Sequence, residues 1–97
     1  MALETTPWNV QDHLQTPEEC ALYLEAVFAE AGDDPTFVAK AIGDVARARG
    51  MSQIARDAGI TREGLYKALS EEGNPSFGTV LKVLSALGLR LHVELAE

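Results

Sequence analysis

Four polar or aromatic side chains recur at helical spacing in the second half of the chain: Arg62, Glu63, Tyr66 and Lys67. Arg62 has the geometry to donate two parallel hydrogen bonds to guanine O6 and N7. Tyr66 suits a thymine methyl group or a phosphate, and Lys67 suits a phosphate oxygen. Glu63 either accepts a hydrogen bond from cytosine N4 or orients Arg62 through an ion pair. With Ser70, these residues form one outward helix face whose chemistry suits the major groove of DNA.

Further polar residues flank this face. Thr61 precedes it and is the expected N-cap, because its hydroxyl accepts a hydrogen bond from a first-turn amide. Arg49 and Arg56 are expected to contact the phosphate backbone, where they position the helix without reading sequence. Gln53 lies near the start of the preceding helix, where a polar side chain also reaches phosphate. These residues complete the candidate DNA-binding set.

Two short helices are needed to hold such a face in place. The sequence predicts them near 51–58 and 62–69, separated by a three-residue turn that begins at Gly59. Ala55 provides a small side chain where the helices touch, and Gly59 suits a backbone with positive φ. The inward positions are apolar: Ile54, Ala58, Ile60, Leu65 and Leu69. This pattern fits a helix-turn-helix, although a plain helical hairpin with a solvated charged face has the same residues.

Three longer helices complete the predicted all-α fold. Capping and helix-ending residues mark their bounds: Thr16 and Gly32, Asp34 and Gly50, Ser76 and Gly88. Their predicted inward stripes are Cys20, Leu24, Val27, Phe28 and Ala31; Val38, Ala41, Ile42, Val45 and Ala46; Phe77, Val80, Leu81, Leu84 and Leu87. We predict a single domain over residues 16–97, preceded by an N-terminal arm (residues 1–15) that lies on the domain through Trp8.

In the last residues the helical spacing of apolar side chains gives way to a two-residue alternation. Apolar and polar side chains alternate over residues 89–95 as in a half-buried strand. Its apolar positions are Leu89, Leu91, Val93 and Leu95. The sequence predicts no other strand, and an unpaired strand edge is commonly covered by another chain. We therefore predict pairing with the same segment of a second copy across a two-fold axis. The alternatives are a coil tail packed on the core and a strand reserved for a different partner.

Charge is distributed unevenly along the chain. The net charge of −7 argues against nonspecific coating of nucleic acid, which depends on many cationic contacts. Residues 1–39 contain eight acidic and no basic residues, whereas residues 40–97 contain eight basic and seven acidic residues. The acidic part either attracts a basic protein partner or serves only to cap helices and maintain solubility.

Few residues indicate catalysis, a metal site or export. Cys20 is the sole cysteine, which excludes an internal disulfide and suits a reducing cytoplasm. His13 and His92 are far apart in sequence, and neither has a serine, cysteine or carboxylate at a catalytic spacing. No stretch has the length of an apolar membrane helix, and the first residues lack a signal-peptide pattern. We expect a cytoplasmic, non-enzymatic protein that needs no cofactor.

Two long runs of the sequence closely resemble one protein family, the addiction-module antidotes. They are IARDAGITREGLYKALS at residues 54–70 and GNPSFGTVLKVLSALGLRL at residues 73–91. The family consists of small antitoxins of bacterial type II toxin–antitoxin systems, within the phage-repressor-like (Cro/C1) helix-turn-helix class. The resemblance covers about residues 8–93 and is most specific from Arg62 to Leu91. It implies a compact five-helix, lambda-repressor-like domain whose helix-turn-helix motif spans residues 51–70.

The resemblance also implies a function and partners. It implies a homodimer that binds operator DNA, represses its own operon and neutralises a small basic toxin of the RelE/HigB-like class. Many phage-type repressors begin the motif with a phosphate-binding Gln, whereas Met51 stands there in this chain and Gln53 follows two residues later. Two other functions also fit the sequence: a stand-alone repressor without a toxin, and a protein adaptor that has kept the fold but lost DNA binding.

Overall fold

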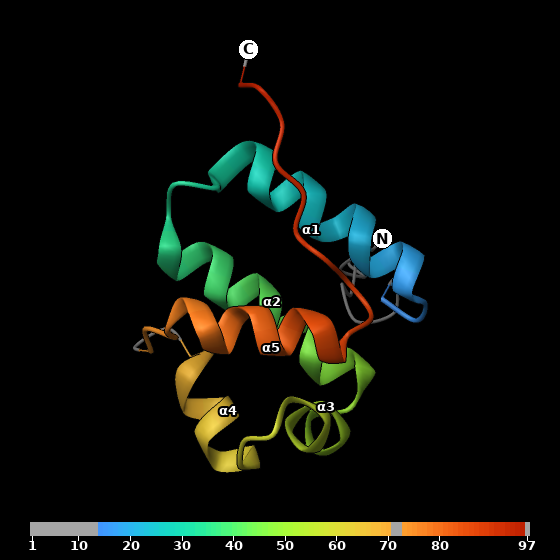
Figure 1. Cartoon of the computed structure of the whole chain (residues 1–97), viewed down its shortest axis with the longest axis vertical. Helices are drawn as coiled ribbons and strands as arrows, with labels where there is room; N and C mark the ends of the chain where they lie inside the picture. The colour runs from blue at the N-terminus through green and yellow to red at the C-terminus, as the bar shows by residue number, and fades with distance from the viewer. Residues whose placement is uncertain (1–13, 71–72, 97) are drawn as a thin grey trace, which may run out of the picture.

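The computed structural model describes residues 14–70 and 73–96, and over these residues the chain is all-helical (Figure 1). The helices follow one another in the order α1 (Pro17–Ala31), α2 (Pro35–Arg49), α3 (Met51–Ala58), α4 (Arg62–Ala68) and α5 (Phe77–Ala86). The predicted all-α class and the five predicted helices are thereby confirmed. The predicted contact of Trp8 lies outside the described residues.

Side-chain caps mark the start of α1, α2 and α5, as Thr61 does for α4. Thr16 Oγ1 accepts a hydrogen bond from the amide of Glu19 (3.1 Å), and Glu19 Oε1 accepts one from the amide of Thr16 (3.1 Å). The two residues thus form a capping box, and the predicted cap at Thr16 is confirmed. Asp34 and Ser76 likewise accept hydrogen bonds from amides in the first turns of α2 and α5, at 3.2 and 3.1 Å. Each such cap typically contributes about 1 kcal/mol to stability.

The core forms around α3, which packs against α2, α4 and α5, while α1 packs against α2. The buried cluster contains Leu14, Cys20, Leu24, Val27, Ala41, Ile42, Val45, Ala46, Met51, Ile54, Ala55, Ala58, Leu65, Leu69, Val83, Leu84 and Leu87. Among the described helices, α4 makes extensive contacts with α3 alone. The opposite side of α4 therefore remains open to solvent.

The predicted inward stripe was wrong at several positions. In α5, Phe77 is 67% exposed and Leu81 is also exposed, whereas Val83 is fully buried. The buried side chains of α5 lie in its later turns, so Phe77 in the first turn lies beyond the core. The buried face is turned toward Val83, on the other side of the stripe from Leu81. Phe28 of α1 is 39% exposed because it borders a surface groove instead of the core.

The C-terminal segment, residues 89–96, forms no strand in this single chain, because the rest of the described chain is helix and turn and offers no strand to pair with. The segment leaves α5 at Gly88, whose φ of 82° is in the left-handed region, and then runs along α1 (Figure 1). Leu89 is half-buried against the core, while Leu91, Val93 and Leu95 are exposed. The predicted strand thus lacks a partner within the described residues.

A tyrosine–carboxylate contact joins α1 to α2. Burial, and then the Asp44 carboxylate to which its hydroxyl is hydrogen-bonded, raises the pKa of Tyr23. Asp44 also accepts a hydrogen bond from Arg47 Nη1 (3.2 Å) and lies 3.9 Å from Lys40 Nζ. The contact therefore favours the neutral form of Tyr23 in the folded state.

This contact predicts a loss of stability at alkaline pH. Because the pKa of Tyr23 is raised by folding, its contribution is fully present below about pH 10 and is lost as the pH rises through the folded-state value. We expect Tyr23→Phe to weaken the alkaline fall in the free energy of unfolding, measured by urea denaturation between neutral pH and about pH 11. Tyr66→Phe, at the other tyrosine, is the matched control and should retain the fall. An unchanged alkaline fall in Tyr23→Phe would contradict the assignment.

Candidate nucleic-acid interface

The turn between α3 and α4 is closed by backbone hydrogen bonds around a left-handed glycine. Gly59 has φ 76° and ψ 28°, which confirms the predicted positive φ. The amides of Gly59 and Ile60 donate to the carbonyls of Arg56 (3.1 Å) and Ala55 (3.0 Å), which ends α3. Thr61 then begins α4, since its Oγ1 accepts a hydrogen bond from the amide of Gly64 (2.9 Å). Its predicted capping role is confirmed.

The inner side of α4 is anchored at two leucines. Leu65 is fully buried, and Leu69, which caps the end of α4, is almost so. Gly43 of α2 lies directly beneath Leu69: a Cβ at Gly43 would be 3.2 Å from the carbonyl oxygen of Leu69 and 3.3 Å from its Cβ. A glycine at this position lets α2 and the end of α4 approach closely.

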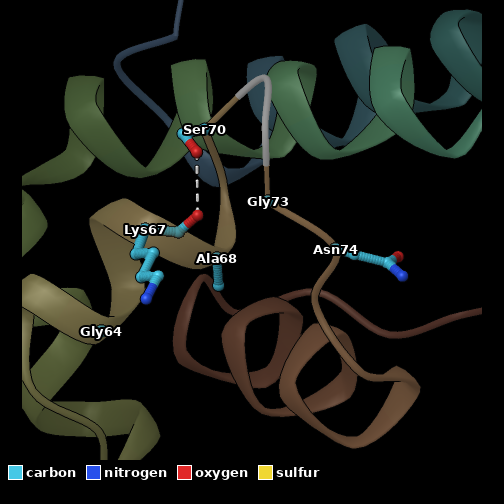
Figure 2. A pocket seen from close by; sticks show the side chains of 6 residues that line it. All are labelled: Gly64, Lys67, Ala68, Ser70, Gly73 and Asn74. Carbon is cyan, nitrogen blue, oxygen red and sulfur yellow. Dashed lines mark hydrogen bonds between the residues drawn. The ribbon is translucent and has the colours of Figure 1, made fainter.

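The outer side of α4 brings together most of the predicted site. Arg62, Glu63, Tyr66 and Lys67 are all exposed, Thr61 is exposed at the start of the helix, and Ser70 is half-buried just beyond its end. Ser70 Oγ donates a hydrogen bond to the carbonyl of Lys67 (2.9 Å), so its hydroxyl serves the end of the helix in this chain (Figure 2).

A surface hollow continues this face past the end of α4. It has a volume of about 390 Å³ and is lined by Gly64, Lys67, Ala68, Ser70, Gly73 and Asn74 (Figure 2). Gly73 sits tightly against the last turn, since a Cβ there would come within 2.2 Å of the carbonyl oxygen of Lys67. The chain beyond α4 is thereby held close to the face that carries Lys67.

A cation–π cluster that the sequence did not predict holds Tyr66. The guanidinium carbon of Arg62 lies 5.3 Å from the centroid of the Tyr66 ring, and that of Arg47, in α2, lies 5.9 Å from it. Arg47 is itself bound to Asp44. Each contact of this kind contributes about 0.5–1 kcal/mol where it is exposed. The cluster orients Arg62 and Tyr66, and it places Arg47 next to the exposed face of α4 that carries Arg62 and Lys67.

One of the two roles left open for Glu63 is not formed in the described chain. Glu63 makes no ion pair with Arg62 there, and the guanidinium of Arg62 lies over the Tyr66 ring instead. An acceptor role toward cytosine N4 remains the other option for its exposed carboxylate.

The remaining predicted residues lie on α3 and at the end of α2. Gln53 Nε2 donates to Asp57 Oδ1 (2.9 Å), and Arg56 Nη1 lies 3.5 Å from Gln53 Oε1, so these polar groups form a small network on the exposed side of α3. Arg49 Nη1 donates to the carbonyl of Gln15, ahead of α1. Gln53 and Arg56 therefore lie together on α3, whereas Arg49 contacts the backbone just before α1.

Other kinds of site find little support in the described ranges. Burial raises the pKa of the Cys20 thiol, whose Sγ lies 3.9 Å from the carbonyl of Leu14 in the core. In residues 14–70 and 73–96, no three His, Cys, Asp or Glu side chains gather as metal ligands would. None of the helices there has the length and apolar character needed to cross a membrane.

Comparison with known proteins places the chain in a family. A family model described as "Probable addiction module antidote protein" matches residues 4–95. A protein of Haemophilus influenzae, described as uncharacterized, is 52% identical over 94 residues, which cover 97% of this chain and 95% of that protein. No solved structure gives a significant match. The chain belongs to the family of probable addiction module antidote proteins.

Proposed function

We propose that this protein is a DNA-binding antitoxin that neutralises a toxin encoded beside it and represses its own operon. The observation that carries the DNA-binding part is the open face of α4, where Arg62, Glu63, Tyr66 and Lys67 are exposed together on a helix anchored by Leu65. Membership of the antidote family supports the antitoxin part. The protein acts in the cytoplasm by binding rather than by catalysis.

In this proposal α3 and α4 act as a helix-turn-helix, with α4 in the major groove. Arg62 reads guanine, while Lys67 contacts phosphate next to it. Gln53 and Arg56, joined on the exposed side of α3, contact the phosphate backbone. Arg47 joins the positive face through its contact with Tyr66.

Dimerisation is part of the proposal, because one small face carries few cationic groups in a protein of net charge −7. Two copies related by a two-fold axis would present two α4 helices to two half-sites, and the separation of the helices would set the half-site spacing. The pair would thus bind an operator that a single copy holds weakly.

The toxin-binding part rests on the charge of α1. Glu18, Glu19 and Glu30 are exposed on α1, as is the apolar Leu22, and residues 14–39 contain no basic residue. This surface favours a basic partner, such as a toxin of the RelE/HigB-like class. Since α1 and α4 lie at opposite ends of the molecule (Figure 1), toxin and DNA would not compete for one surface.

The test separates the DNA-binding and toxin-binding parts. The purified chain should bind a labelled fragment from upstream of its own gene about a thousandfold or more tighter than a scrambled fragment of equal composition at physiological salt, measured by fluorescence anisotropy. Expression of the adjacent gene alone should arrest growth, and co-expression of this chain should restore it.

The two readouts also distinguish the alternatives. Growth rescue without preference for the upstream fragment would refute DNA reading by α4 and indicate an adaptor. Preference for that fragment without rescue would refute the antitoxin role and indicate a stand-alone repressor.

A further inference from the structure

The C-terminal segment leaves a groove open beside α1. The groove has a volume of about 620 Å³ and is lined by Leu24, Phe28 and Ala29 of α1 and by residues 89–94 of the segment, both apolar and charged. Val93 and Leu95 are 90% and 88% exposed, although both are apolar. Contiguous exposed apolar surface of this kind marks a site of association.

The charges of the segment are self-complementary. In the single chain Arg90, His92 and Glu94 line the groove together with their apolar neighbours. Because the two kinds of residue alternate, the charged ones would share one side of the segment once it is extended as a strand. In an antiparallel pair of such segments centred on His92, Arg90 of each copy stands opposite Glu94 of the other. In the same pair, Leu91 stands opposite Val93, so apolar side chains also meet.

Other arrangements lose this match. A parallel pair in register places Arg90 opposite Arg90 and Glu94 opposite Glu94, and like charges directly opposite are destabilising. An antiparallel pair centred on Leu91 or on Val93 sets His92 against one charged residue and leaves the other charged residue outside the pair. Only the arrangement centred on His92 forms two opposite-charge pairs.

We propose that residues 89–95 of two copies form an antiparallel two-stranded ribbon centred on His92, held by two reciprocal Arg90–Glu94 pairs. In the ribbon the apolar side chains of the segment turn to one side, toward α1, and Val93 and Leu95 become buried there. The inference deepens the proposed dimer by specifying its surface and its register. The acidic residues Glu18 and Glu30 do not line the groove, so the ribbon leaves them accessible.

The first test reverses the charges. Arg90→Glu and Glu94→Arg should each raise the dimer dissociation constant about tenfold, because both cross-strand pairs become repulsive. The double variant should restore dimerisation, and an equimolar mixture of the two single variants should form the heterodimer. Lys82→Glu makes the same charge change as Arg90→Glu at an exposed position of α5 and serves as the matched control. Sedimentation velocity, without DNA or toxin, measures all of these.

Two outcomes of that test would overturn the register. One is a double variant that dimerises no better than the single variants. The other is an Arg90→Glu dimer as stable as that of Lys82→Glu. Because neither DNA nor toxin is present, a failure here is distinct from a failure of operator binding or of toxin neutralisation.

The second test locates the centre of the ribbon. Residues directly opposite in an antiparallel pair have Cβ atoms about 4.5–5.5 Å apart, so His92→Cys should form an intermolecular disulfide rapidly under mild oxidation. Arg90→Cys and Glu94→Cys place their sulfurs four residues out of register and should cross-link far more slowly. The wild-type chain, whose Cys20 is buried, sets the background. Equal rates at the three positions would overturn the proposed centre.

Discussion

Replacing Arg62 by alanine is expected to cost about 1–3 kcal/mol of binding free energy on the operator and little on random DNA. The guanidinium of Arg62 is exposed on α4, lies over the ring of Tyr66 and makes no ion pair with Glu63 in the described chain. The guanidinium is thus held at the surface, and its N–H donors are not engaged by the carboxylate of Glu63. The loss should be concentrated at the base pair that Arg62 reads.

Lys67→Ala is the matched comparison for this prediction, because it removes an exposed positive charge from the same helix. It should weaken binding to all sequences alike and reduce the salt dependence of binding by about one phosphate contact. Fluorescence anisotropy over a series of salt concentrations, with operator and random fragments, measures both effects. Equal losses on both fragments for both variants would rule out base reading by Arg62.

Leu65→Ala is expected to lower the free energy of unfolding by about 2–5 kcal/mol, the usual range for a leucine truncated in a packed core. Leu65 is the fully buried side chain of α4 and belongs to the core cluster, so its truncation leaves a cavity among packed side chains. The variant should therefore lose stability and operator affinity together. Urea denaturation monitored by circular dichroism gives the change in stability.

Glu63→Ala is the stability control for this prediction, because Glu63 is exposed on the same helix and its loss should change stability by no more than about 0.5 kcal/mol. If Leu65→Ala were as mild as this control, α4 would not be anchored as described. If Leu65→Ala is too unstable to purify, the milder Leu65→Val at the same site can be measured instead. It should lower the free energy of unfolding by a smaller amount.

The features predicted correctly from sequence are those determined by near neighbours along the chain. The cap at Thr61 involves an amide only three residues away, and the turn at Gly59 needs only a residue that accepts positive φ. The outward face of α4 follows from the burial of Leu65 and the helical period. Because the candidate base-reading residues lie on one short helix, their grouping was also within reach of sequence analysis.

Contacts between elements distant in sequence were missed. The approach of Arg47 to Tyr66 joins α2 to α4 and has no local signal, since arginine near the end of a helix is common for other reasons. The hydrogen bond from Arg49 to the carbonyl of Gln15 likewise has no local signal, and the phosphate contact of Arg49 stays a prediction. Val83 and Leu81 are equally apolar, and only the position of α3 decides which one is buried. The structure assigns no strand to residues 89–96, and the strand predicted over residues 89–95 stays a prediction.

The central place of α3 has a kinetic consequence. All of the extensive helix contacts join helices that are adjacent in the chain or separated by one other helix. In domains dominated by such local contacts, closing the short loops between contacting residues costs little chain entropy. Such domains fold within about microseconds to milliseconds. A newly synthesised chain would therefore have folded binding surfaces soon after its last helix leaves the ribosome. The rate at which it forms complexes with its partners would then depend on its concentration and not on its folding.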